Sequence, residues 1–204
     1  MLKTHFTQLI LRHSTDSTIA DSLWTELVRR YTAAERYYHT LSHIEAVIAG
    51  LNEVRSLIRD WDTVLFAVYY HDIIYNATAA DNEQQSAALA AKRLAALGYP
   101  EDGIALCIAM ILATKEHRKS EDVDTDFVTD ADLSILGQRP DIYKQYTENI
   151  RKEYAMFPAL LYKAGRKSVL RNLLAMDRVY KTAHFYHKYE AQARQNLEQE
   201  LLQL

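Results

Sequence analysis

The sequence predicts an all-α protein, and three observations support this fold class. Only five Gly and three Pro occur among 204 residues, too few for the many tight turns of a β-sandwich or barrel. Residues of high helix propensity, such as Ala, Leu, Glu, Gln, Lys and Arg, fill long stretches of the chain. Within these stretches apolar residues recur every three or four positions, as on the buried face of a helix.

Each predicted helix is placed by its apolar period and by the cap or breaker residues beside it. After a short amino-terminal strip, Asp16 or Ser17 can cap the first helix. The expected helices are 17–31, 44–59, 61–75, 83–97, 101–114, 141–154, 159–180 and a last one to the carboxyl end. Helix 61–75 is apolar almost all round, so we expect it at the centre of the bundle. The charged segment 115–129 lacks an apolar period and is predicted to be an irregular, functional connection.

The length favours one domain over residues 1–204, with a motif core at about 36–137 on which helices 140–204 pack. A net charge of −3 gives no general attraction to nucleic acid. No segment has the roughly 18 to 20 apolar residues of a membrane span, and residues 1–14 lack the apolar core of a secretory signal. We therefore expect a cytoplasmic protein without nucleic-acid or membrane partners. The single cysteine, Cys107, lies in an apolar run and is predicted to be a core residue.

An adjacent His-Asp pair, His71-Asp72, stands at the end of the apolar helix 61–75. An ionised carboxylate in such surroundings costs several kcal/mol unless it is paired or binds a cation. Imidazole and carboxylate together suit a divalent ion, although the pair could also be a core histidine hydrogen-bonded to a carboxylate. His43, upstream on another predicted helix, and Asp132, downstream after the charged connection, bring the available nitrogen and oxygen ligands to four.

Several motifs carry a resemblance to a known family. They are Arg36-Tyr-Tyr-His-Thr-Leu-Ser-His43, His71-Asp-Ile-Ile-Tyr75, Asn82-Glu-Gln-Gln-Ser-Ala87, Ala113-Thr-Lys-Glu-His117, Asp130-Ala-Asp-Leu-Ser-Ile-Leu-Gly137 and Ile150-Arg-Lys-Glu-Tyr154. With these motifs the chain resembles the HD superfamily of metal-dependent phosphohydrolases, most of all a branch with an Arg-x-Tyr-His-x-Leu-x-His start. The motifs are specific for the family but not for a substrate.

The resemblance implies an HD-domain helical bundle with His43, His71, Asp72 and Asp132 as ligands of a divalent metal ion, which could be Mn, Fe, Mg, Zn, Ni or Co. It implies hydrolysis of a small phosphate ester or nucleotide by metal-activated water. The alternative is a metal- and nucleotide-binding sensor or interaction module with little turnover. The last helix could serve contacts in a homo-oligomer under either hypothesis.

Two of the ligand assignments have competitors. His39 and His43 are spaced i,i+4, so both could reach one ion if the helix already includes His39. We prefer His43, because the Ile-Glu-Ala-Val that follows it matches the family pattern, and His39 is then a substrate-binding or structural residue. Asp130 competes with Asp132. The resemblance favours Asp132, and Asp130 could instead cap the helix that it enters.

Five more charged residues are candidates around the site. Lys115 and His117 precede Asp132 and could bind phosphate or shuttle a proton. Glu83 could activate water or orient a ligand, but a glutamate in a first helical turn also favours the helix dipole without any catalytic task. One of Arg151 and Arg166 could bind phosphate through the guanidinium fork, although arginines on helices often simply face solvent.

Overall fold

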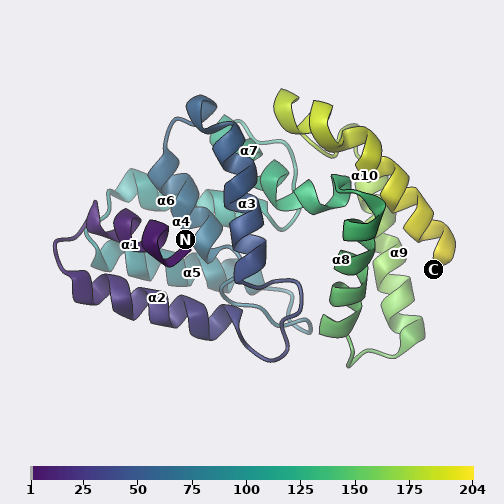
Figure 1. Ribbon diagram of the computed structural model, residues 1–204, viewed down its shortest axis with the longest axis horizontal. Helices are drawn as coiled ribbons and strands as arrows, with labels where there is room; N and C mark the ends of the chain where they lie inside the picture. The colour runs from purple at the N-terminus through teal and green to yellow at the C-terminus, as the bar shows by residue number, and fades with distance from the viewer. Residues whose placement is uncertain (1) are drawn as a thin grey trace.

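The chain, seen in a computed structural model that describes residues 2–204, is built of helices and short connections (Figure 1). Over these residues there are ten α-helices, two short 3₁₀ helices and no strand, so the predicted all-α class is confirmed. The α-helices are α1 (Leu2–Leu11), α2 (Ser17–Tyr31), α3 (Leu41–Glu53), α4 (Trp61–Tyr70), α5 (Asn82–Ala96), α6 (Glu101–Ala113), α7 (Val123–Asp132), α8 (Pro140–Glu153), α9 (Ala159–Ala175) and α10 (Ala183–Gln203). The 3₁₀ helices are η1 (Arg55–Leu57) and η2 (Leu133–Gly137).

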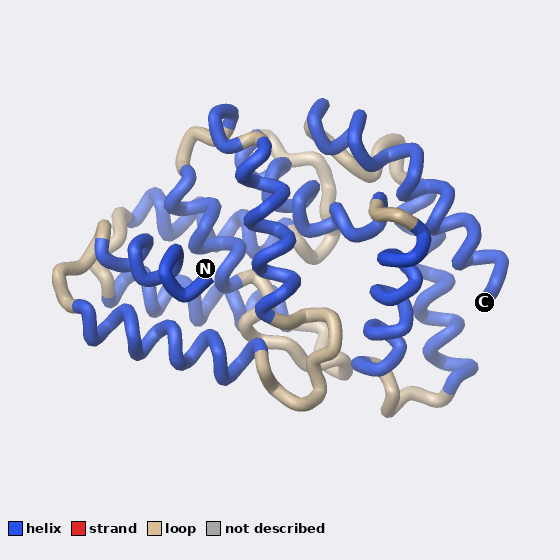
Figure 2. Tube along the Cα trace, in the orientation of Figure 1, coloured by secondary structure: helices blue, strands red, loops and turns tan. Residues whose placement is uncertain are grey.

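The helices form two groups that lie side by side, α1–α7 and α8–α10 (Figures 1 and 2). The link between them is η2, which continues directly from α7 and packs against both α8 and α10. Gly137 permits this packing, because a Cβ atom there would lie only 2.8 Å from the carbonyl oxygen of Tyr189. The second group of helices is therefore anchored next to the carboxyl end of α7.

Helix α4 is the centre of the first group, as its apolar character predicts. It packs against α3, α5, α6 and α7, and every residue from Thr63 to Tyr70 is buried. The helix ends at Tyr70 rather than at the predicted residue 75, because the chain turns away after His71. Side chains from other segments bind the backbone of this turn. Arg36 Nη2 donates to the Ile73 carbonyl over 3.0 Å, and the Ile74 N–H donates to Ser86 Oγ over 3.1 Å.

Two segments without predicted helix are helical in the structure. Residues 2–11 form α1, whose Phe6, Leu9 and Ile10 are fully buried against the core. The predicted irregular connection 115–129 is wrong in its second half, because α7 begins at Val123 and Asp122 caps it. The charges that suggested a loop point inward instead. Asp124 accepts the backbone N–H groups of Arg59 and Asp60, and Asp126 accepts that of Ser120, so both carboxylates fasten neighbouring loops.

The other boundaries fall close to expectation, with two exceptions. The predicted helix 44–59 is too long, because α3 ends at Glu53 and the 3₁₀ helix η1 follows it. Asp16 caps α2 by accepting the Thr18 N–H, as one of the two predicted alternatives requires. The predicted helix 159–180 is too long, because α9 ends at Ala175 and the next seven residues form a connection that buries Val179, Tyr180 and Thr182. Cys107 is buried in the core, as predicted. Among residues 2–204 no helix is both long and apolar enough to cross a membrane.

Candidate metal centre

Three packed helices bring the four predicted ligands together. His43 lies in the first turn of α3, His71 caps the carboxyl end of α4 with Asp72 directly after it, and Asp132 is the last residue of α7. Helices α3, α4 and α7 pack against one another in pairs. Residues that are far apart in sequence therefore meet at one end of the central core, where both histidines are buried.

The donor atoms of these side chains converge within a small volume. The Nε2 atoms of His43 and His71 are 3.1 Å apart. Asp132 Oδ1 lies 3.0 Å from His43 Nε2 and 3.6 Å from His71 Nε2. Asp72 Oδ2 lies 2.9 Å from His71 Nε2 and 3.7 Å from His43 Nε2. We call these four residues the acceptor cluster.

The protonation of His71 shows that the acceptor cluster needs a positive charge at its centre. Nδ1 of His71 lies 2.8 Å from the Val68 carbonyl, to which it can only donate, so the neutral ring presents a bare Nε2 to the cluster. That lone pair then faces a second imidazole nitrogen and two carboxylates, which repel it unless a proton or a metal ion lies between them.

The donor spacing suits a metal ion. Ligands at about 2.0–2.2 Å from one ion lie about 3 Å from their neighbours, which is close to the shorter separations observed here. The potential ligand atoms of His43, His71 and Asp132 all lie within 4.8 Å of one another. The cluster of His43, His71 and Asp132 could therefore hold a metal ion, and Asp72 contacts both of its imidazoles.

A proton competes for the same place. Burial alone would lower the pKa of His71, but Asp72 and Asp132 outweigh it and raise that pKa well above its ordinary value. Burial opposes ionisation of Asp132, whereas hydrogen bonds from His117, His43 and His71 hold its pKa well below the usual range. The pKa of Asp72 is likewise lowered, by His71 and His39 against the effect of burial. Both carboxylates are thus ionised at neutral pH.

Asp130 and Asp132 have separate tasks. Asp130 accepts the backbone N–H groups of Lys181 and Thr182 and the Thr182 hydroxyl, at 2.7–3.0 Å. It therefore fastens the connection before α10, rather than capping the helix that it enters. Its pKa is raised by burial, although Lys181 lies beside it and lowers it. Of the two competing carboxylates, only Asp132 reaches the acceptor cluster.

His39 lies near the acceptor cluster but outside it. Its ring centroid is 6.0 Å from that of His43, and its Nδ1 bonds to Glu153 Oε2 over 2.7 Å. Burial would lower the pKa of His39, but Asp72 and Glu153 outweigh burial and raise it. His39 precedes α3 rather than belonging to it, so the condition under which both histidines could reach one ion is not met.

His117 and Lys115 both face the site. His117 Nε2 lies 2.8 Å from Asp132 Oδ2, the oxygen turned away from His43. The His117 backbone has φ 51°, a left-handed conformation that is uncommon outside glycine and marks a locally strained position. The Lys115 ammonium bonds to the Ala80 carbonyl and lies 3.4 Å from Glu83 Oε2. Glu83 is therefore brought to the same rim as a partner of Lys115.

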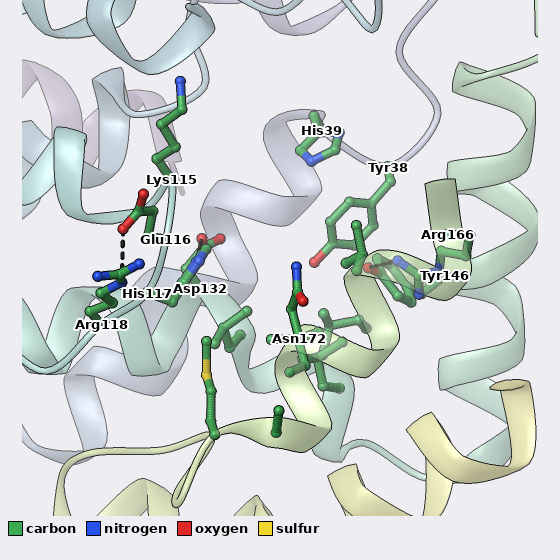
Figure 3. Close-up of a pocket in the computed structure, with 17 residues that line it drawn as sticks. Tyr38, His39, Lys115, Glu116, His117, Arg118, Asp132, Tyr146, Arg166 and Asn172 are labelled. Carbon is green, nitrogen blue, oxygen red and sulfur yellow. Dashed lines mark hydrogen bonds and ion pairs between the residues drawn. The ribbon is translucent and has the colours of Figure 1, made fainter. Parts of the chain in front are cut away.

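Two cavities meet at these residues. The larger has a volume of about 720 Å³ and the smaller about 370 Å³, and His39, Lys115, His117 and Asp132 line both. Figure 3 shows the larger one, with His117 and Asp132 on one side and Tyr38, Tyr146 and Arg166 on the other. Its remaining wall is mostly apolar, from residues of η2 and α9 that include Ile135, Leu136, Val169 and Leu173.

The two late arginines are placed differently. Arg166 borders the larger cavity, but its guanidinium makes two bonds to Glu200, at 2.7 and 2.9 Å, so its charge is already paired. Arg151 donates to the carbonyls of Tyr154 and Phe157 and borders a separate cavity formed by α8, α9 and α10. The structure therefore brings Arg166, but not Arg151, to the cavity beside the acceptor cluster.

Reasoning from the sequence missed several residues that line or support the site. Tyr38, Tyr146 and Asn172 border the larger cavity, and no spacing in the sequence pointed to them. Glu153 is the most connected of those missed, since it binds three backbone N–H groups, His39 and Tyr75. It stands in the motif Ile150-Arg-Lys-Glu-Tyr154, which marked the segment without giving the glutamate a task.

In comparisons with known proteins, no family model, no curated protein and no solved structure matches this chain. The resemblance to the HD superfamily therefore stays a prediction that is based on the motifs.

Proposed function

We propose that this protein is a metal-dependent phosphohydrolase of the HD type, acting on a small phosphate ester or nucleotide. One observation carries the proposal: two imidazoles and two carboxylates converge at the edge of a cavity whose rim bears His39, Lys115 and His117. A site for a cation therefore lies beside groups that attract a phosphate.

The donor set favours certain ions and a certain chemistry. Two nitrogen and two oxygen ligands suit Mn²⁺, Fe²⁺ or Zn²⁺ better than Mg²⁺, which prefers oxygen alone. Such an ion would lower the pKa of a bound water and polarise a phosphoryl oxygen. His43, His71, Asp72 and Asp132 would hold it: His43 and Asp132 lie in α3 and α7, and His71 and Asp72 directly follow α4, so all four are positioned by helices that pack on the core.

The chain's own residues would bind and orient the substrate. The Lys115 ammonium and the His117 ring lie on the rim shared by both cavities, where they would attract a phosphate and hold it beside the acceptor cluster. The larger cavity, at about 720 Å³, falls within the range of small-molecule sites. Its apolar side, formed by η2 and α9, would receive the organic part of the substrate and exclude water from it.

The proposal is tested by metal analysis joined to a substrate screen. We expect the purified full chain to carry about one transition metal and, when loaded, to hydrolyse members of a panel of nucleotides and phosphomonoesters. Asp72→Ala should lose both metal and hydrolysis. If metal-loaded protein hydrolyses no member of the panel, the proposed phosphohydrolase activity is refuted. Binding of a nucleotide without turnover, measured by calorimetry with Mn²⁺ present, would then identify a sensor.

A further inference from the structure

The loop before α3 holds one imidazole in a fixed orientation. Nδ1 of His39 lies 2.7 Å from Glu153 Oε2, and the Tyr75 ring packs against the imidazole with 4.3 Å between centroids and 31° between the ring planes. The Tyr75 hydroxyl also donates to Glu153 Oε2, over 2.9 Å. The ring of His39 is therefore fixed both in its plane and along its face.

Glu153 is placed so that it only accepts hydrogen bonds. Its side chain has no exposed surface, and its Oε1 accepts the backbone N–H groups of Tyr37, Tyr38 and His39 at 2.7–3.0 Å. A carboxylate surrounded by five donors stays ionised. It therefore fixes the proton of His39 on Nδ1 and leaves Nε2 as the atom that exchanges protons with its surroundings.

Nε2 of His39 is free of hydrogen bonds within the described part of the protein, and His39 borders the two cavities without being part of the acceptor cluster. His39 lines both cavities together with Asp132, and among residues 2–204 its Nε2 has no hydrogen-bond partner. The other two basic groups on that rim are already engaged: His117 Nε2 bonds to Asp132, and Lys115 bonds to the Ala80 carbonyl beside Glu83. His39 is thus the rim residue whose proton is available to a bound ligand.

We propose that His39 donates the proton that the leaving group requires, with Glu153 as the residue that positions it. The inference rests on the proposed phosphohydrolase function. As water attacks phosphorus, the P–O bond to the alcohol breaks and its electron pair stays on the alcohol oxygen. The proton on His39 Nε2 passes to that oxygen, so that a neutral alcohol leaves. The proton released by the attacking water restores His39 through solvent.

A comparison of two esters tests the proton transfer. A nitrophenolate leaves readily without a proton, whereas an alkyl alcohol does not, so only the alkyl ester depends on a proton donor. In metal-loaded full-length protein, His39→Asn should lower kcat for an alkyl phosphate by about 10²- to 10⁴-fold. Its kcat for p-nitrophenyl phosphate should fall less than about tenfold, and its metal content should be unchanged, because His39 is not a ligand.

Glu153→Gln tests the positioning. The three backbone N–H groups keep the amide oxygen at Oε1, so the new NH₂ faces His39 and donates to Nδ1. That exchange moves the ring proton to Nε2 of a neutral imidazole, which is a very weak acid. We expect Glu153→Gln to show the same selective loss on the alkyl ester, although the histidine is intact.

Glu190→Gln is the matched control. Glu190 is another buried carboxylate, and it accepts the backbone N–H groups of Val179 and Tyr180 but holds no histidine. The Glu190→Gln variant should keep the wild-type ratio of activity on the alkyl phosphate to activity on p-nitrophenyl phosphate. Equal losses on both esters in the His39→Asn variant, or no loss on either, would overturn this inference and leave the proposed function intact. A metal-loaded wild type that hydrolyses neither ester would overturn both.

Discussion

Two buried groups of polar side chains lie near His39, and they differ in what surrounds their oxygens. In the first, which we call the Glu153 clamp, one carboxylate is met by the N–H groups of Tyr37, Tyr38 and His39, the His39 ring and the Tyr75 hydroxyl. In the acceptor cluster, carboxylate oxygens and imidazole nitrogens face one another. The clamp is satisfied by the protein alone, whereas the cluster requires a proton or a metal ion.

The same difference separates the other buried carboxylates of this fold into structural residues and candidate ligands. Asp124, Asp126, Asp130 and Glu190 resemble the clamp, because each accepts backbone N–H groups from a neighbouring connection. A carboxylate bonded in this way stabilises a loop. Asp132 lies on the same helix as three of these acids, yet it meets three histidine rings instead. What surrounds a carboxylate, and not its depth, separates the candidate ligand from the structural acids.

The largest effect is expected when Asp132 and Asp130 are exchanged for asparagine one at a time. Asp132→Asn should lower metal affinity by more than about 100-fold, because it removes an anionic ligand. Asp130→Asn should keep the metal and lower the free energy of unfolding by about 3–5 kcal/mol, since it leaves the buried Lys181 ammonium without its counter-ion. Calorimetric metal titration and urea unfolding of both variants measure these two quantities.

These two variants can contradict the distinction between Asp132 as a ligand and Asp130 as a structural acid. Loss of metal in both, with equal loss of stability, would mean that the two acids form one network and that the acceptor cluster is not a separate site. Retention of metal in Asp132→Asn would remove Asp132 from the ligands and leave His43, His71 and Asp72 to hold the ion.

The second effect concerns stability at low pH. Burial opposes ionisation of Glu153, but the bonds from His39 and the backbone lower its pKa from 4.5 to about 2. A depressed pKa stabilises the fold above the unfolded value, and this contribution is lost as the pH falls through the folded value. The wild type should therefore exceed Glu153→Gln in stability by about 3 kcal/mol at pH above about 5, and this advantage should shrink toward pH 2.

Urea unfolding of both proteins at about pH 5 and about pH 3 measures the difference. Both pH values lie below 6.5, the ordinary pKa of His39, which is raised in the folded protein, so the contribution of His39 is complete at both and does not change between them. A gap between the two proteins that is equal at both pH values would show that the ionised form of Glu153 is not what stabilises the clamp.

The fold was largely predictable from the sequence, and the exceptions have a common physical cause. Apolar periods give α2, α5, α6 and α8 to within about one residue at each end, because each buries one face, but they overrun the carboxyl ends of α3, α4 and α9. They miss α7, whose buried face carries Asp124 and Asp126. A carboxylate that faces the interior to bind loop N–H groups looks in sequence like one that faces solvent.

The candidate site was predictable only in part. The spacing of His43, His71, Asp72 and Asp132 indicated ligands, and the structure brings these side chains together. Spacing could not reveal Glu153, which reaches His39 from more than a hundred residues away. Nor could it separate Arg166, paired with Glu200 at the cavity, from Arg151, which borders another cavity. Such differences arise from packing between the two groups of helices, on which a local pattern carries no information.

The smallest expected effect tests the contact between His117 and Asp132. His117 occupies a left-handed backbone conformation that asparagine tolerates well, so His117→Asn should change stability by less than about 1 kcal/mol. Asparagine is too short to keep the 2.8 Å bond to Asp132 Oδ2. Asp132 then loses a group that orients it, and metal affinity should fall by about 10- to 100-fold, as measured by calorimetric titration.

His117→Ala separates orientation from backbone strain. Both variants lose the bond to Asp132, but only alanine also disfavours the left-handed conformation, at a cost of about 1 kcal/mol. If orientation of Asp132 sets the affinity, the two variants should bind metal equally and differ only in stability. Wild-type affinity in His117→Asn together with weak binding in His117→Ala would instead show that the backbone at residue 117, and not the imidazole, keeps Asp132 in place.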